Sequence, residues 1–186
     1  MKKAKTALLI CDMMNTFDFT EAGKLLPQAL LAAKAIAKLK RSLKRRGVKV
    51  IYVNDNFGSW LSDWKTIFLT CTEFDCLGKE IAEILKPEAD DYFILKPKHS
   101  GFHSTALDVL LNQIGVKRLI ITGIAGNICV LFTAHDAHMR EFEVVVPSDC
   151  TASNKAADNR FALQQLKTNF GMSTPTSATL IKSFDA

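Results

Sequence analysis

The sequence predicts a Rossmann-like α/β fold with three layers, in which helices cover both faces of a mainly parallel, six-stranded sheet. Short runs rich in β-branched and aliphatic residues alternate with helical periods, and this alternation implies right-handed crossovers between parallel strands. The runs ALLI, LIIT and VVV are continuously apolar, which is typical of strands buried on both faces. The expected strands are Ala7–Cys11, Val48–Asn54, Tyr92–Lys96, Arg118–Thr122, Glu143–Pro147 and Thr179–Lys182.

The helices between these strands are predicted from their periodicity and their ends. Residues 107–114 carry leucine and isoleucine at helical spacing, and Gly115 follows as a helix-ending residue. A short helix is expected at Lys79–Leu85. Ser153 or Asn154 is expected to cap the last long helix, because a side-chain oxygen there accepts from a free amide.

The longest departure from the alternation is the segment 55–91. It holds several aromatic side chains, namely Phe57, Trp60, Trp64, Phe68 and Phe74. The rings of Phe57, Trp60 and Trp64 would suit the wall of a pocket for a flat substrate, but a packed loop or a subunit interface explains them equally well.

Length and composition indicate one domain spanning residues 1–186. Apolar residues make up 48% of the chain and charged residues 23%, which is ordinary for a globular domain. The five cysteines are odd in number and follow no signal-peptide pattern, so we expect free thiols in a reducing cytoplasm, with a Cys71–Cys76 disulfide as the minor alternative. No apolar run approaches the roughly 18 residues that span a bilayer, so no membrane association is expected.

The net charge of +5 raises the question of a nucleic-acid partner. The basic residues concentrate between Lys34 and Arg46, in a predicted helix whose apolar residues form a separate stripe. Lys44, Arg45 and Arg46 lie in its last turn, where the helix dipole favours cations. A solvated helix face therefore explains the charge, and we expect no nucleic-acid partner.

Polar residues follow the carboxyl ends of the predicted strands, where open parallel sheets bind their ligands. Asp12 follows the first strand, and Asn54 and Asp55 follow the second. Lys96 ends the third strand, and Cys129 follows the fourth. A carboxylate, an ammonium group and a thiol should therefore meet at one edge of the sheet.

Cys129 is predicted to lie in the first turn of a helix that follows the fourth strand. Free amides, the helix dipole and a nearby Lys96 would lower the pKa of its thiol. The alternative is a buried cysteine that packs as a small apolar residue. Asp12 has a comparable alternative as a turn-forming residue, and Lys96 as a surface lysine.

Taken together, four motifs resemble those of the isochorismatase-like cysteine hydrolases. They are residues 7–17 (ALLICDMMNTF), 95–102 (LKPKHSGF, then Thr105, Leu107 and Asp108), 121–130 (ITGIAGNICV, then Thr133-Ala-His-Asp-Ala) and 148–153 (SDCTAS). The order and spacing of these motifs cover nearly the whole chain. The resemblance implies that family's fold and the hydrolysis of a small amide, ureide or imide.

The resemblance also implies residue roles. Asp12 becomes the general base and acid, Lys96 orients and stabilises charge, and Cys129 is the nucleophile. A cis peptide bond would join Ile124 to Ala125 and aim the amides of Ala125 and Cys129 at the oxyanion. The thiolate attacks a carbonyl carbon, Asp12 protonates the departing amine, and water activated by Asp12 hydrolyses the acyl-enzyme.

Metal use separates the branches of this family, because its nicotinamidases bind a metal through an aspartate and histidines after the second strand. The four histidines here are at 99, 103, 135 and 138, and Phe57 stands where that motif would want histidine. We therefore expect no metal and no other cofactor. Isochorismatases proper do not need the cysteine, so Cys129 favours acyl chemistry, with isochorismatase or nicotinamidase activity as a further alternative.

The remaining expectations concern the substrate and partners. The candidate substrate-binding residues are Asn54, Asp55, Asn56, Phe57, Trp60, His99 and Phe102, and His99 is equally well explained as a surface residue. His135 and His138 are expected to be structural. The family's members are commonly dimers or tetramers, so a homo-oligomer acting on a small molecule is expected. A catalytically idle scaffold that binds a small ligand or a partner protein stays open as the alternative.

Overall fold

The computed structural model describes residues 5–73 and 75–185. Its six strands form one parallel sheet in the order β3-β2-β1-β4-β5, with β6 also paired to β4. The strands are β1 Thr6–Cys11, β2 Lys49–Asp55, β3 Tyr92–Lys96, β4 Arg118–Ile124, β5 Glu143–Val145 and β6 Thr151–Ala152. The helices are α1 Ala22–Lys44, α2 Trp64–Glu73, α3 Lys79–Ile84, α4 Leu107–Gln113, η1 Gly126–Val130 (a π-helical turn), α5 Leu131–Met139, α6 Ala156–Phe170 and α7 Ser177–Ser183.

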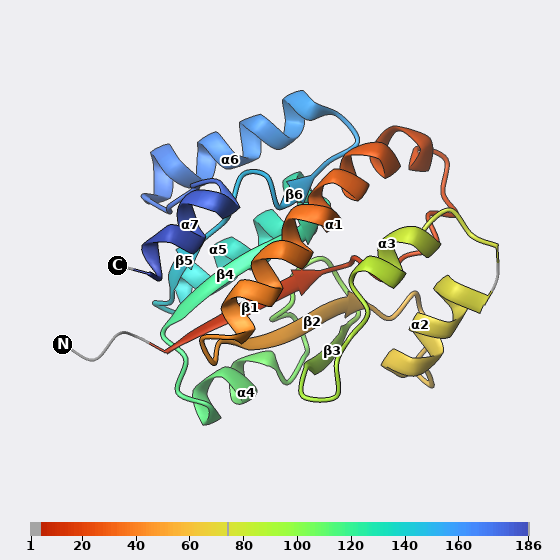
Figure 1. Cartoon of the computed structure of the whole chain (residues 1–186), viewed down its shortest axis with the longest axis horizontal. Coiled ribbons are helices and arrows are strands. Elements are labelled where there is room, and N and C mark those ends of the chain that lie inside the picture. Colours follow the sequence, from red (N-terminus) through yellow and green to blue (C-terminus); the bar gives the residue numbers. More distant parts are fainter. Residues whose placement is uncertain (1–4, 74, 186) are drawn as a thin grey trace.

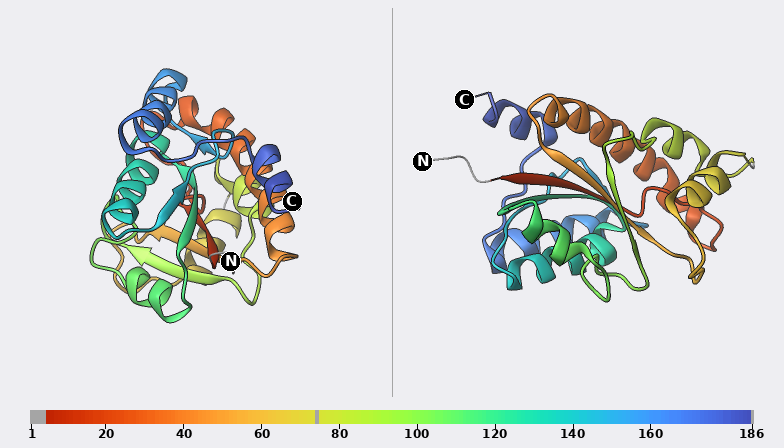
Figure 2. Two further views of the ribbon diagram at one scale, coloured as in Figure 1. Left: turned by 90° about the vertical axis from the view of Figure 1, so that its left-hand side faces the viewer. Right: turned by 90° about the horizontal axis from the view of Figure 1, so that it is seen from below.

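Helices cover both faces of the sheet, as the sequence predicts. The views from below and from the side place α1, α3 and α7 on one face and α4, α5 and α6 on the other (Figure 2). Helix α2, which belongs to the segment 55–91, lies at the end of the molecule near the carboxyl ends of β2 and β3 (Figure 1).

The strands are buried on both faces because successive side chains point to opposite layers. Leu8 and Ile10 of β1 pack into the core beneath α1. Ala7 and Leu9 of the same strand pack into the second core, beneath α4 and α5. All four side chains are 0% exposed, which explains why these strands show no polar alternation in the sequence.

The prediction of a last strand at Thr179–Lys182 is wrong. This segment lies in helix α7, which begins after Thr176, whose hydroxyl accepts a hydrogen bond from the Thr179 N–H at 3.2 Å. Leu180 of this helix is buried in the core that α1 covers. The cap and this packing override the β propensity of Thr-Leu-Ile, and the sixth strand is the two-residue β6 instead.

The segment 55–91 folds as a loop and two short helices, of which α3 was predicted and α2 was not. The Trp64 ring packs 6.3 Å from that of Phe93, while Trp60 is 79% exposed. Phe74 lies outside the described residues. Cys71 and Cys76 are free thiols, so the disulfide alternative is wrong; the Cys76 thiol donates to the Cys71 carbonyl at 2.8 Å.

The basic residues of α1 are not simply a solvated face. Lys40 is buried, and its Nζ lies 2.7 Å from Oδ2 of Asp91, a carboxylate that is itself buried. Lys44 forms ion pairs with Asp90 and Asp91 at 2.6 and 2.7 Å. The expectation of a solvated face is therefore wrong for Lys40, because the loop before β3 turns its carboxylates towards α1. In the part of the chain that is described, no helix is long and apolar enough to cross a bilayer.

Candidate active site

Asp12, Lys96 and Cys129 converge at the carboxyl edge of the sheet. Lys96 Nζ lies 2.9 Å from Asp12 Oδ2 and 3.7 Å from Cys129 Sγ. Lys96 is completely buried and Asp12 is 5% exposed, so the ion pair is shielded from water. The expected convergence of carboxylate, ammonium and thiol is present, and Lys96 is not a surface lysine.

The backbone that carries Asp12 is held by the neighbouring strand. Asp12 has a left-handed φ of 52°, an uncommon conformation for a residue other than glycine. Its N–H donates to the Val53 carbonyl at 3.0 Å, and its Oδ1 accepts from the Asp55 N–H at 2.7 Å. The end of β2 therefore fixes both the turn and the carboxylate.

Asn54 has a structural role that replaces its predicted role as a substrate contact. Its side-chain amide is buried, accepts from the Met14 N–H at 3.1 Å and donates to the Met14 carbonyl at 2.9 Å. Because both ends of the amide are used by the chain, Asn54 holds the loop after β1. Asp55 instead turns to the site, with Oδ2 at 3.7 Å from Lys96 Nζ.

Cys129 lies in the π-helical turn η1, which continues directly into α5. Gly126 begins this turn, and a Cβ there would lie 2.0 Å from the Asn159 side-chain oxygen, so a larger residue would require the Asn159 side chain to move. The Ile124–Ala125 peptide bond is cis. The backbone of Ala125, which carries one of the two expected oxyanion amides, acts to lower the pKa of the Cys129 thiol, although larger effects outweigh it.

Ser153 caps this turn rather than the last helix. Its hydroxyl accepts from the Asn127 N–H at 3.1 Å, while α6 begins after Lys155 with no side-chain cap. The prediction that Ser153 or Asn154 caps α6 is therefore wrong. The Ser153 hydroxyl binds the Asn127 N–H because this amide, in the first turn of the nucleophile helix, would otherwise lack a hydrogen-bond partner.

Thr133 links Cys129 to the loop after β3, although it is not among the predicted site residues. Its hydroxyl donates to the Cys129 carbonyl at 2.7 Å and accepts from the Gly101 N–H at 3.0 Å. Ser100, the preceding residue, donates to the Asp136 carboxylate on α5. The signal in the sequence was the threonine four residues after the cysteine, on the same helix face.

The pKa of Cys129 is raised to about 12, so the expectation that its thiol has a lowered pKa is wrong. Burial is the largest cause and the Asp12 carboxylate the next, and together they outweigh Lys96. Burial also raises the pKa of Asp12, against the effect of Lys96. Burial lowers the pKa of Lys96, but the Asp12 carboxylate, the largest opposing effect, makes its net shift upward. The resting site is therefore a neutral thiol beside an ammonium–carboxylate pair.

These shifts predict the pH dependence of catalysis. Asp12 must be ionised to accept the thiol proton, so activity should fall as pH drops through its pKa. Because that pKa is raised, the acid limb of kcat/KM should lie above about 3.9, the ordinary aspartate value. A pH–rate profile with full activity down to the ordinary aspartate range would contradict this proton transfer.

Two other candidate substrate residues lie in the segment 55–91, directly after β2. Asn56 and Phe57 line a cavity of about 380 Å³ together with residues of α2 and of the loop after β1. Asn56 is buried and accepts from the Gly58 N–H at 3.0 Å, whereas Phe57 is 53% exposed. Trp60 is largely exposed to solvent and does not line this cavity.

His99 and Phe102 lie on the same loop but differ in placement. His99 is exposed, and its Nδ1 lies 4.0 Å from Cys129 Sγ. Phe102 is buried in the second core and its ring packs 6.1 Å from that of Phe142. The structure thus brings His99 to the nucleophile and makes Phe102 a core residue, contrary to its prediction as a substrate contact.

His135 and His138 pack against the Phe170 ring, at 4.6 and 5.8 Å between centroids. This contact joins α5 to α6. It agrees with the structural role expected for both histidines.

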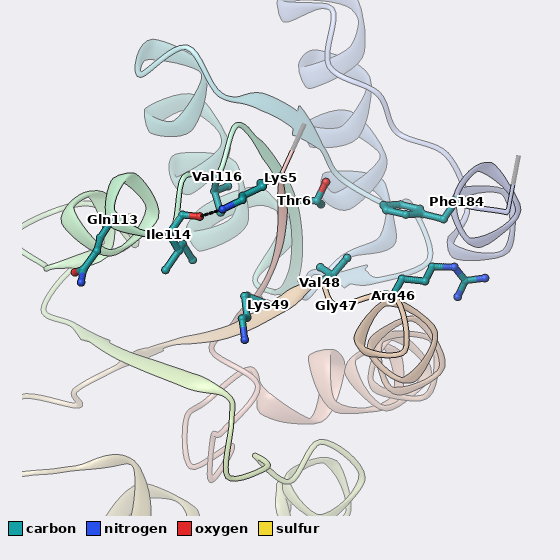
Figure 3. Close-up of a pocket in the computed structure, with 10 residues that line it drawn as sticks. All are labelled: Lys5, Thr6, Arg46, Gly47, Val48, Lys49, Gln113, Ile114, Val116 and Phe184. Carbon is teal, nitrogen blue, oxygen red and sulfur yellow. Dashed lines mark hydrogen bonds between the residues drawn. The ribbon is translucent and has the colours of Figure 1, made fainter. Parts of the chain in front are cut away.

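Another cavity, of about 590 Å³, lies at the opposite, amino edge of the sheet. Figure 3 shows the residues that line it. Two of the cations that line it are hydrogen-bonded to backbone carbonyls: Lys5 Nζ donates to the Ile114 carbonyl after α4, and Arg46 donates to the Ser42 carbonyl in α1. This cavity lacks a nucleophile paired with a base, so the chemistry belongs to the carboxyl edge.

Metal independence stays a prediction. Among residues 5–73 and 75–185, no group of three or more histidine, cysteine or acidic side chains is arranged to hold a metal ion. We expect hydrolysis to survive prolonged treatment with EDTA, measured against the untreated enzyme. A complete loss of rate that added Zn²⁺ or Mn²⁺ restores would contradict this expectation.

Comparison with known proteins identifies the family. The family model described as Isochorismatase domain matches residues 6–178. The uncharacterized isochorismatase family protein YaaI of Bacillus subtilis is 46% identical over 167 residues, covering 90% of this chain and 91% of that protein. The ureidoacrylate amidohydrolase RutB of Serratia proteamaculans is 29% identical to this chain, and the match covers 90% of this chain and 78% of that protein.

Solved structures agree with the fold. N-carbamoylsarcosine amidase from Thermoplasma acidophilum superposes with a TM-score of 0.71 at 27% identity, over 93% of this chain and 96% of that chain. An isochorismatase family protein from Desulfovibrio vulgaris superposes with a TM-score of 0.79 at 23% identity, over 99% and 100%. With the family model matching most of its length, the protein belongs to the isochorismatase family of hydrolases.

Proposed function

We propose that the protein hydrolyses a small amide, ureide or imide through an acyl-enzyme on Cys129. The observation that supports this most is the position of Lys96 Nζ, 2.9 Å from the Asp12 carboxylate and 3.7 Å from the Cys129 sulfur. A buried cation that contacts both a base and a thiol has little structural justification, since burying charges is costly.

The resting charges indicate how the nucleophile forms. Cys129 is a thiol at neutral pH because its pKa is raised, so Asp12 removes the proton as the sulfur attacks the carbonyl carbon. Lys96 then faces the developing negative charge on either group. The Ala125 and Cys129 amides receive the oxyanion, and the proton held by Asp12 passes to the departing nitrogen.

The relatives point to a substrate class. A ureidoacrylate amidohydrolase and an N-carbamoylsarcosine amidase both share the family, and both names describe cleavage of a nitrogen-bearing acyl group. We propose a small carbamoyl or amide compound as the substrate, acted on in the cytoplasm by a dimer or tetramer. Exposed apolar side chains such as Phe132 and Phe161 support an oligomer.

Ammonia release tests this function directly. The purified protein is incubated with ureidoacrylate, N-carbamoylsarcosine and nicotinamide, and consumption of isochorismate is measured in parallel. Release from one of the amides that Cys129→Ala abolishes supports the proposal. No release from a wide panel of amides and ureides favours the idle scaffold, and cleavage of isochorismate alone favours ether hydrolysis.

A further inference from the structure

The Cys129 sulfur contacts two kinds of titratable group. Asp12 and Lys96 are buried, whereas His99 is exposed and places its Nδ1 4.0 Å from Sγ. A water molecule that enters from solvent therefore meets the imidazole more readily than the carboxylate.

His99 is held in this position by its surroundings. Its ring packs 5.6 Å from that of Phe132 on α5. The next two residues of the loop, Ser100 and Gly101, are hydrogen-bonded to the side chains of Asp136 and Thr133 on the same helix. The loop and the nucleophile helix thus form one unit that presents the imidazole to the sulfur.

The Asp12 carboxylate is less accessible to water than the His99 imidazole. Its Oδ1 accepts from the Asp55 N–H at 2.7 Å, and its Oδ2 lies 2.9 Å from Lys96 Nζ. Both oxygens therefore have donors before a water arrives, and the group is 5% exposed. Hydrolysis of an acyl-enzyme needs a base within reach of water as well as of the acyl carbon.

We propose that His99 is the catalytic base that activates water in the second half of the reaction, an inference that rests on the proposed acyl-enzyme. Neutral His99 takes one proton from water as the water oxygen bonds to the acyl carbon. The tetrahedral adduct collapses, the C–S bond breaks, and its electron pair returns to Sγ. The imidazolium then gives its proton to Sγ, which restores the Cys129 thiol, neutral His99 and a free carboxylic acid.

The distances suit this step. An acyl carbon lies about 1.8 Å from its sulfur, and a base reaches its proton donor at about 2.6–3.2 Å. With Nδ1 at 4.0 Å from Sγ, a water can contact both the imidazole and the acyl carbon.

The experiment isolates deacylation by starting from a preformed acyl-enzyme. The protein is acetylated with p-nitrophenyl acetate, excess reagent is removed, and loss of acetyl from the Cys129 peptide is followed by mass spectrometry. We compare wild type, His99→Ala and His103→Ala, whose exposed histidine lies on the same loop. Decay should slow at least about tenfold in His99→Ala and keep the wild-type rate in His103→Ala. Because each decay starts from acetylated protein, the rate of the acetylation step does not enter the comparison.

Chemical rescue separates catalysis from a structural role. Added 2-methylimidazole, a base whose methyl group hinders attack on the thioester, should restore decay in His99→Ala and leave His103→Ala unchanged. Equal decay in the two variants, or slow decay that 2-methylimidazole does not restore, would overturn the role of His99. If the wild type never acetylates Cys129, the acyl-enzyme proposal fails, and this inference fails with it.

Discussion

Replacing Cys129 by alanine is expected to lower turnover of the best amide substrate by at least about 10⁴-fold, the scale on which loss of a catalytic nucleophile acts. The sulfur is the atom that forms the covalent intermediate, and alanine supplies no nucleophile in its place. The measurement is ammonia release at saturating substrate.

Cys76→Ser is the matched control for this variant. Cys76 is also partly exposed and donates through its sulfur to a carbonyl, a hydrogen bond that a serine hydroxyl reproduces. Its turnover should stay close to that of the wild type. A Cys129→Ala variant that keeps a tenth of the wild-type rate would rule out the covalent mechanism.

Replacing Asp12 by asparagine should produce two effects of opposite sign. Turnover should fall at least about a hundredfold, because the proton acceptor is lost. The thiol should become more reactive, because the Asp12 charge and hydrogen bond raise the pKa of Cys129 whereas Lys96 lowers it. Removing the carboxylate leaves the effect of Lys96, so more thiolate should be present at neutral pH.

Iodoacetamide labelling at about pH 7 with peptide mapping measures the second effect, and the Cys76 peptide is the internal reference in each sample. Cys129 should be labelled faster in Asp12→Asn than in the wild type. Slower labelling together with lower turnover would mean that Asp12 activates the thiol by stabilising a resting thiolate, contrary to the neutral thiol inferred here.

The sequence predicts the fold well where the strands are continuously apolar. The strand Tyr92–Lys96 is reproduced residue for residue, and β1 and β4 differ only at their ends. The error at Thr179–Lys182 arose because Thr-Leu-Ile fits a strand locally, whereas the Thr176 cap and burial of Leu180 make it a helix. Short segments of this kind depend on packing that a local pattern does not contain.

The same distinction holds for the candidate site, where some features follow from residue order and others depend on packing. The position of Asp12, Lys96 and Cys129 after their strands predicts their convergence, because parallel strands end at one edge. The roles of Asn54 and Ser153 depend on which backbone amides lack partners, namely those of Met14 and Asn127. The pKa of Cys129 depends on burial and on its distance from Asp12, and residue order gives neither.

The most direct test of the covalent mechanism is to trap the intermediate during turnover. The enzyme is mixed with the best substrate of the amide panel, quenched in acid within milliseconds, digested and mapped by mass spectrometry. The mechanism predicts an acyl group, with the mass of the substrate less its leaving amine, on the peptide that contains Cys129 and on no other cysteine peptide. Rapid turnover with an unmodified Cys129 peptide, in an enzyme whose Cys129→Ala variant stays active, would contradict it.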